Sequence, residues 1–208
     1  MSKGLLITFE GPEGSGKTTH IALLAAYLRS KKYRVLVTRE PGGTALAVGI
    51  RKLLLDGGEG LSPTAELFLY EADRAQHVHE TLKPALLQGK VVLCDRYTDS
   101  TLAYQGSGRG LDVKAIKILN SIASEGVKPH LTLLLDVPVK RGLRLAKRKK
   151  RRHDRLERAG LAFHQRVRKG FLRLAKAEPA RFRIIPQQST IAATQLLILR
   201  VVDTFLNP

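Results

Sequence analysis

Residues 11–18 read GPEGSGKT and match the complete phosphate-loop pattern Gly-x-x-x-x-Gly-Lys-Ser/Thr. The apolar run 5–9 precedes this loop, and apolar residues at helical spacing follow it at 20–25. A strand, a glycine-rich loop and a helix in this order place backbone N–H groups around phosphates at the helix N-terminus. This segment therefore predicts a nucleoside triphosphate site in an α/β fold. A glycine-rich turn that binds no ligand is the alternative.

Single residues of this phosphate loop have separate expected roles. Lys17 is expected to reach the terminal phosphates as a catalytic residue, and the Thr18 hydroxyl to bind Mg²⁺. Phosphate oxygens would repel the Glu13 carboxylate, so we expect it to point away from the donor toward a hydroxyl group of an acceptor. An exposed side chain without a partner is the alternative for Glu13. The predicted ATP-binding residues are Gly11, Pro12, Glu13, Gly14, Ser15, Gly16, Lys17 and Thr18.

Short apolar runs alternate with helical patterns along the rest of the chain. The predicted strands are 4–9, 34–38, 91–95, 131–136 and 182–185. The predicted helices are 17–30, 44–55, 63–88, 111–124, 138–152, 155–177 and 190–206. This alternation is typical of right-handed crossovers and a parallel sheet covered on both faces, with ligands at the carboxyl ends of the strands. The 208 residues favour one domain, 1–208, with a basic flap at about 145–158.

Basic residues are concentrated in one part of the chain. The sequence holds 36 Lys and Arg against 18 Asp and Glu, and half of the basic residues lie between Lys140 and Arg183. Phosphates or a nucleic-acid backbone would suit such a segment. A solvated basic helix face is the alternative.

Cysteine content and apolar run lengths indicate a cellular location. The single cysteine, Cys94, excludes an intramolecular disulfide and a cysteine-based zinc cluster. No apolar segment is long enough for a membrane span, and the first apolar run leads directly into the phosphate loop. We therefore expect a cytoplasmic protein that is not bound to a membrane.

Polar residues follow two of the predicted strands at the edge where ligands are expected. The second strand ends in TREPGGT, where Pro41 and two glycines predict a tight turn that is compatible with a cis peptide. The third strand delivers Asp95, a candidate ligand of the metal's water shell, and Arg96, a candidate clamp for a second phosphate. A structural salt bridge between Asp95 and Arg96 is the alternative.

Tyr70 and Arg74 stand four residues apart on the predicted helix 63–88 and share one face. A phenol ring beside a guanidinium group suits a planar base that carries a carbonyl oxygen. A core position is the alternative for Tyr70.

Several motifs together resemble those of bacterial thymidylate kinases. They are FEGPEGSGKTT, TREPGGT, LYEADRAQH, CDRYTDSTLAYQG, and DRLE with the following FHQRVRKGF, in order across nearly the whole chain. The resemblance implies a P-loop nucleoside-monophosphate-kinase fold with a five-stranded parallel sheet covered by helices on both faces. It also implies transfer of the γ-phosphoryl group of ATP to dTMP, with Mg²⁺, by a homodimer.

The same resemblance implies a set of dTMP-binding residues, which we call the acceptor set. Glu13 would face the deoxyribose, and Tyr104 would disfavour a 2′-hydroxyl group. Tyr70 would stack on thymine and Arg74 would donate to its carbonyl. The remaining members would meet the base, Thr101 and Gln105, or hold the acceptor phosphate, Arg39, Arg51 and Arg96.

The source of the catalytic arginine differs among thymidylate kinases. Some members carry it within the phosphate loop, at the position that is Gly14 here. The resemblance to bacterial members that use the basic flap therefore implies Arg148, Arg151 or Arg152 as the catalytic residue, with Arg155 as an acceptor-side or structural support. Basic residues recur here at three- to four-residue spacing, so that one helical stripe can aim several arginines at one place: Arg141, Arg144, Arg148 and Arg151 or Arg152.

Two rival functions fit parts of the sequence. One is a P-loop kinase for another nucleoside monophosphate or a small alcohol. The other is a nucleic-acid-binding ATPase that uses the +18 net charge, but the 5% aromatic content offers few stacking platforms, and no recognition helix or RNA-binding motif is evident. We therefore expect nucleic-acid binding to be weak, salt-sensitive and incidental at most. A GTPase is disfavoured because the Asn-Lys-x-Asp signature is absent.

Overall fold

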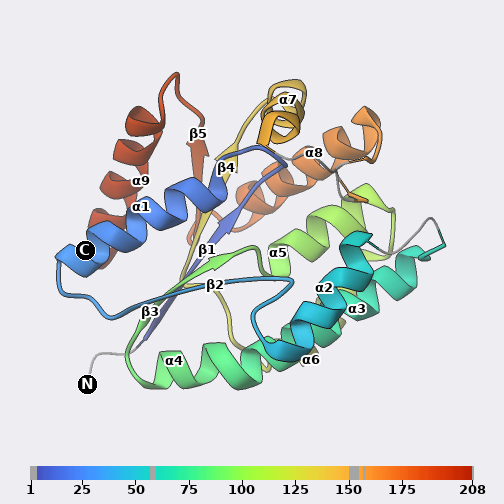
Figure 1. The fold of residues 1–208 in the computed structure, drawn as a ribbon, viewed down its shortest axis with the longest axis horizontal. Helices are drawn as coiled ribbons and strands as arrows, with labels where there is room; N and C mark the ends of the chain where they lie inside the picture. Colours follow the sequence, from blue (N-terminus) through green and yellow to red (C-terminus); the bar gives the residue numbers. More distant parts are fainter. Residues whose placement is uncertain (1–3, 57–59, 150–154, 157, 208) are drawn as a thin grey trace.

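The computed structural model describes residues 4–56, 60–149, 155–156 and 158–207, and it contains a parallel sheet covered by helices on both faces (Figure 1). The strands are β1 Leu5–Glu10, β2 Val35–Arg39, β3 Val91–Asp95, β4 Leu131–Asp136 and β5 Phe182–Pro186. Their order is β2-β3-β1-β4-β5, and every neighbouring pair is parallel. The predicted five-stranded parallel sheet is confirmed, and each strand boundary lies within one residue of its prediction.

The helices agree with the predicted pattern, with one addition. They are α1 Lys17–Ser30, α2 Ala45–Asp56, α3 Pro63–His77, the π-helical turn η1 Val78–Leu82, α4 Lys83–Leu87, α5 Thr98–Thr101, the π-helical turn η2 Leu102–Gly108, α6 Val113–Ala123, α7 Val139–Lys149, α8 Leu161–Ala177 and α9 Ile191–Leu206. Among the described helices, none has the length and apolar composition needed to cross a bilayer. The continuous helix expected over 63–88 contains η1, and the helix expected from 155 begins at Leu161.

The α5–η2 segment was not predicted from the sequence. Its residues 101–106 are all buried, so they present no apolar stripe against a polar face. Close packing explains the burial: a Cβ at Gly108 would lie 2.7 Å from the Phe163 ring, and one at Gly170 would lie 2.5 Å from Ser107 Oγ. The segment therefore depends on α8, which lies directly against it.

The sheet is apolar on both faces, as expected for parallel strands between helices. Ile7 and Phe9 of β1 pack on one face with Leu24 of α1 and Ile198 of α9. Leu6 of the same strand packs on the other face with residues of η1. Figure 1 shows α1 and α9 side by side on the first face. This packing fixes the carboxyl ends of the strands along one edge.

Three segments meet at that edge. The phosphate loop connects β1 to α1, and Gly11, Gly14 and Gly16 all have positive φ. The turn after β2 contains a cis peptide between Glu40 and Pro41, which confirms the compatibility inferred from the sequence. The third segment is the tip of β3, where Asp95 lies in register with Phe9 of β1.

The phosphate loop and the first turn of α7 approach each other closely through their backbones. A Cβ at Gly14, whose φ is +69°, would lie 1.9 Å from the carbonyl oxygen of Gly142. A Cβ at Gly142 would lie 2.4 Å from the carbonyl oxygen of Glu13. Neither position has room for a side chain, so the backbone of α7 packs closely against the phosphate loop. α7 also leads into the basic flap.

We expect Gly142→Ala to weaken ATP binding roughly tenfold or more, because the added methyl group must push the loop carbonyl away. Isothermal titration calorimetry of ATP with Mg²⁺ measures the change. Gly49→Ala is the control, since a Cβ at that helical position meets nothing within 4 Å. Equal ATP affinities in the two variants would contradict the close contact.

Candidate functional site

A cavity of about 290 Å³ opens at the carboxyl edge of the sheet. The phosphate loop from Glu13 to Thr18 lines one part of it, and the other walls include residues of β2, α2, α3, β3, α7 and the α5–η2 segment. Every residue of the acceptor set lines this cavity: Glu13, Arg39, Arg51, Tyr70, Arg74, Arg96, Thr101, Tyr104 and Gln105. The structure thus brings together residues that the sequence spreads over four motifs and, for Arg51, a position outside them.

Lys17 is held against the loop from which it projects. Its ammonium group donates to the carbonyl oxygens of Gly11 (3.1 Å) and Pro12 (3.2 Å) and to Ser15 Oγ (3.3 Å). Burial and the nearby Arg96 guanidinium lower the pKa of Lys17 to about 8. All three acceptors are neutral, so a phosphate oxygen can replace them with a gain in charge interaction.

Thr18 and Asp95 form the candidate metal site. Thr18 Oγ1 donates to Asp95 Oδ2 at 3.1 Å and links the first turn of α1 to the tip of β3. A hydroxyl and a carboxylate beside a phosphate loop fit Mg²⁺, which binds one or two protein oxygens together with substrate phosphates and water. When bound there, the ion would supply positive charge to the phosphate oxygens.

Glu13 faces the α5–η2 segment. Its Oε1 accepts from Arg96 Nη2 (2.6 Å) and from the Tyr104 hydroxyl (2.9 Å). Burial would raise the pKa of Glu13, but Arg96 and Lys17 outweigh it and lower the pKa to about 2. Arg96 also donates to the carbonyl oxygen of Gly11 and stacks 4.8 Å above the Tyr104 ring. Glu13 therefore points toward acceptor-side residues; its contact with a sugar stays a prediction.

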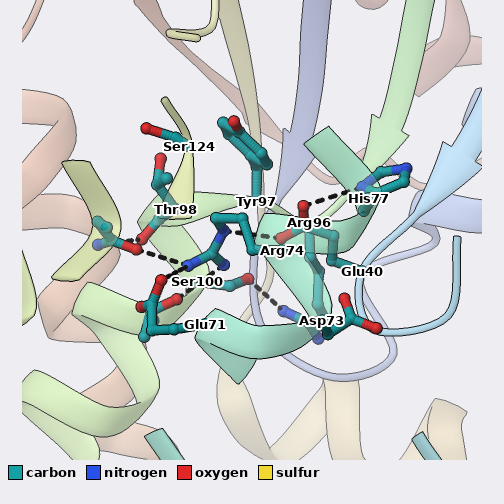
Figure 2. Close-up of polar contacts among 12 residues, drawn as sticks. Glu40, Glu71, Asp73, Arg74, His77, Arg96, Tyr97, Thr98, Ser100 and Ser124 are labelled. Atoms are coloured by element: carbon teal, nitrogen blue, oxygen red, sulfur yellow. Dashed lines mark hydrogen bonds and ion pairs between the residues drawn. The ribbon is translucent and has the colours of Figure 1, made fainter. Parts of the chain in front are cut away.

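Arg74 lies at the centre of a buried polar network, which Figure 2 shows in close-up. Nε donates to Glu40 (2.9 Å), Nη1 to Glu71 (2.8 Å) and to Asn120 (2.6 Å), and Nη2 to Thr101 (2.9 Å). A guanidinium group carries five N–H hydrogens, one on Nε and two on each Nη. The bonds to described residues use the Nε hydrogen, both Nη1 hydrogens and one Nη2 hydrogen. The second Nη2 hydrogen is the one with which Arg74 can bind a ligand.

The turn after β2 is fixed by residues to which the sequence analysis gave no role. His77 Nδ1 donates to Glu40 Oε1 at 3.0 Å, and its Nε2 lies 2.7 Å from Thr38 Oγ1. Asp73 Oδ1 accepts from the Gly42 N–H at 2.8 Å. Burial and the Glu40 carboxylate raise the pKa of Asp73 to about 7. Asp73 and His77 share one helix face at i, i+4, a spacing that was readable in LYEADRAQH.

Glu10 is a second buried carboxylate that sequence reasoning missed. It ends β1, and it accepts from the Tyr97 backbone N–H (2.8 Å) and from Ser100 Oγ (2.6 Å). Burial and the Asp99 carboxylate raise its pKa to about 8. Its two contacts fix the start of the α5–η2 segment relative to β1. The motif FEG contains Glu10, but a terminal strand residue carries no local signal of such a role.

The other members of the acceptor set differ in exposure. Arg39 is exposed, and Arg51 Nη1 donates to the carbonyl oxygen of Pro41 at 2.6 Å. Tyr70 is half-buried beside the aromatic cluster under α8, and burial raises the pKa of its phenol, which stays neutral. Thr101 and Gln105 are buried on the α5–η2 segment. Their predicted ligand contacts stay predictions.

The flap is described only in part. Arg148 is an exposed residue of α7, whereas Arg151 and Arg152 lie outside the described residues. Arg155 donates to the carbonyl oxygen of Leu54 at 3.2 Å and to the Glu66 carboxylate. Arg155 thus has the structural contacts expected of a support; the catalytic role of the other three arginines stays a prediction.

Comparison with known proteins agrees with the geometry of the cavity. The thymidylate kinase family model matches residues 9–198. A thymidylate kinase of Geobacter sulfurreducens is 52% identical, over 98% of this chain and 97% of that protein. One from Deinococcus radiodurans is 52% identical over 89% of both. The crystal structure of thymidylate kinase from Ehrlichia chaffeensis superposes with a TM-score of 0.80 at 37% identity, covering 96% of this chain and 99% of that one.

The family match and the cavity lead to the same assignment. The matched segment includes the phosphate loop and every residue of the acceptor set. The solved relative has the P-loop nucleoside-monophosphate-kinase fold that the five-stranded sheet also shows. The chain belongs to the thymidylate kinase family.

Proposed function

We propose that this protein transfers the γ-phosphoryl group of ATP to dTMP, giving dTDP and ADP. One observation carries the proposal: a single cavity is lined by a phosphate loop and by the complete acceptor set. Donor and acceptor would therefore meet inside one space that the sheet edge positions. Such positioning supplies much of the rate enhancement in phosphoryl transfer.

On the donor side, the phosphate loop would bind the triphosphate of ATP. Backbone N–H groups and Lys17 would neutralise its oxygens, with Mg²⁺ held by Thr18 and, through its water shell, by Asp95. The hydrogen bond between Thr18 and Asp95 supports this assignment, because it places both oxygens beside the loop.

On the acceptor side, Arg39, Arg51 and Arg96 would hold the phosphate of dTMP. The exposed guanidinium of Arg39 supports this role, since it has room to reach a ligand. The acceptor phosphate is already ionised at neutral pH, so no general base is required. The reaction instead needs charge neutralisation and alignment of the two phosphates.

A flap arginine would stabilise the equatorial oxygens of the transferring group. The close contact between Gly14 and Gly142 supports this assignment, because position 14 of the loop has no room for a cationic side chain. Arg148, Arg151 and Arg152 are the candidates.

We also propose a homodimer in the cytoplasm. The helices α2 and α6 both pack against α3, and all three expose large apolar side chains. Leu53 on α2, Phe68 on α3, and Ile118 and Ile122 on α6 are 55% to 69% exposed. Apolar side chains gathered on neighbouring helices are typical of a protein contact.

Several arginines of the basic segment between Lys140 and Arg183 make intramolecular contacts. These contacts weaken the case for a nucleic-acid-binding function. Arg166 donates to the carbonyl oxygen of Gly108, Arg168 to Asp136 and Arg181 to Asp99. The guanidinium groups of these arginines already stabilise the fold. Incidental binding of nucleic acid by the remaining exposed basic residues stays a prediction.

The first test is a coupled assay with ATP, Mg²⁺ and either dTMP, dUMP, dCMP or dGMP. We expect dTMP to be preferred, and Lys17→Ala to abolish turnover while the circular dichroism spectrum stays native, because the terminal phosphates lose their cation. Lys114→Ala removes an exposed lysine on α6 and should turn over normally. Full activity of a folded Lys17→Ala variant would contradict the donor-site assignment.

The second test concerns the flap. The triple change of Arg148, Arg151 and Arg152 to alanine should lower kcat by about 10³-fold or more, as loss of an arginine finger does, with little change in KM for dTMP. The triple change of Lys31, Arg34 and Arg200 to alanine removes the same charge from exposed positions elsewhere and should keep kcat. A near-normal kcat for the folded flap variant would place the cation elsewhere.

The third test is the oligomeric state. Ile122→Asp should convert the dimer to a monomer, because a carboxylate cannot be buried unpaired in an apolar contact. Size-exclusion chromatography with light scattering measures the mass. Leu87→Asp, at an 84% exposed position on α4, is the control and should leave the dimer intact. A wild-type monomer would contradict the dimer.

A further inference from the structure

Glu66 is a fully buried carboxylate in the first turn of α3. Its Oε1 accepts from Gln105 Nε2 of η2 at 2.5 Å. Its Oε2 accepts from Arg109 Nη2, just after η2, at 3.1 Å, and from Arg155 Nη2. Glu66 therefore joins α3 to two other segments of the chain, and one of its three partners lines the cavity.

The chemistry of these contacts fixes the orientation of the Gln105 amide. Two guanidinium groups balance the buried negative charge of Glu66, and an ionised carboxylate can only accept hydrogen bonds. An amide has one donor end, Nε2, and one acceptor end, Oε1. Because Nε2 faces Glu66, the Gln105 amide is held in the orientation in which Oε1 is the acceptor that it can offer to a ligand in the cavity.

Arg74 supplies a complementary group one helical turn away. Its remaining Nη2 hydrogen lies beside Thr101, which precedes Gln105 by four residues. This side of the cavity thus offers a donor from Arg74 and an acceptor from Gln105. A pyrimidine with a carbonyl at C4 and an N–H at N3 matches both groups. Cytosine presents an amino group at C4 and a lone pair at N3, and so opposes both.

We propose that Glu66 is a specificity-determining positioning residue. By holding the Gln105 amide in one orientation, it selects a 4-oxo pyrimidine monophosphate over a 4-amino one. The proposal rests on the proposed function and concerns the same cavity. Selection of this kind is strong, because a wrong base leaves buried polar groups of the site unpaired.

The test compares kcat/KM for dTMP, dCMP and dUMP in the wild type and in Glu66→Gln. A glutamine at position 66 can donate as well as accept, so the Gln105 amide is free to turn. We expect the dTMP to dCMP ratio of kcat/KM to fall about tenfold or more, with KM for ATP unchanged within about twofold. The dTMP to dUMP ratio should stay constant, because uracil presents the same C4 carbonyl and N3–H as thymine.

A matched control removes another buried carboxylate. Asp99 is fully buried and pairs with Arg181 at 2.7 and 2.8 Å, and its partners Arg181 and Thr132 lie outside the acceptor set. Asp99→Asn should lower the melting temperature and leave both substrate ratios unchanged. If Glu66→Gln does not fold, Gln105→Leu removes the amide itself and should also lower the dTMP to dCMP ratio.

Different results of these assays would contradict the role of Glu66 and the proposed function. A wild type that does not phosphorylate dTMP would overturn both. A wild type that does, with an unchanged dTMP to dCMP ratio in folded Glu66→Gln, would overturn the role of Glu66 alone. Equal falls in the dCMP and dUMP comparisons would also overturn it, because they indicate a general loosening of the cavity.

Discussion

The burial of the Arg74 guanidinium group is the constraint on which the acceptor side depends. A cation that is only 1% exposed must find acceptors inside the protein, and Arg74 finds them in Glu40, Glu71, Thr101 and Asn120. These residues belong to the turn after β2, to α3, to α5 and to α6. One side chain therefore holds four segments at the distances that a nucleotide pocket requires, and it keeps one donor for the ligand.

The donor and acceptor halves of the cavity share one ion pair, between Glu13 and Arg96. Glu13 belongs to the phosphate loop, and Arg96 follows the tip of β3, so their contact links the proposed donor and acceptor phosphate sites. The parallel sheet makes this possible because the carboxyl ends of β1 and β3 lie in register. Binding at either site changes the charge that the shared pair experiences.

The sequence predicted local features well and long-range contacts poorly. The strands were predictable to within a residue because each is a short, mostly apolar run. The residues of the acceptor set, most of which lie in motifs, line one cavity, and their contacts with a ligand stay predictions. The α5–η2 segment was missed because burial on all sides removes its periodicity. Glu10 and Glu66 were missed because their partners lie far along the chain, at Tyr97 and at Gln105 and Arg155. No local pattern encodes such pairings.

The backbone contact between Gly14 and Gly142 also limits where a cation can enter the phosphate loop of this chain. An arginine side chain at position 14 and the first turn of α7 cannot occupy the same space. An arginine at position 14 would therefore have to displace α7 or shift the loop. Grafting a loop arginine into this chain would require α7 to be redesigned as well.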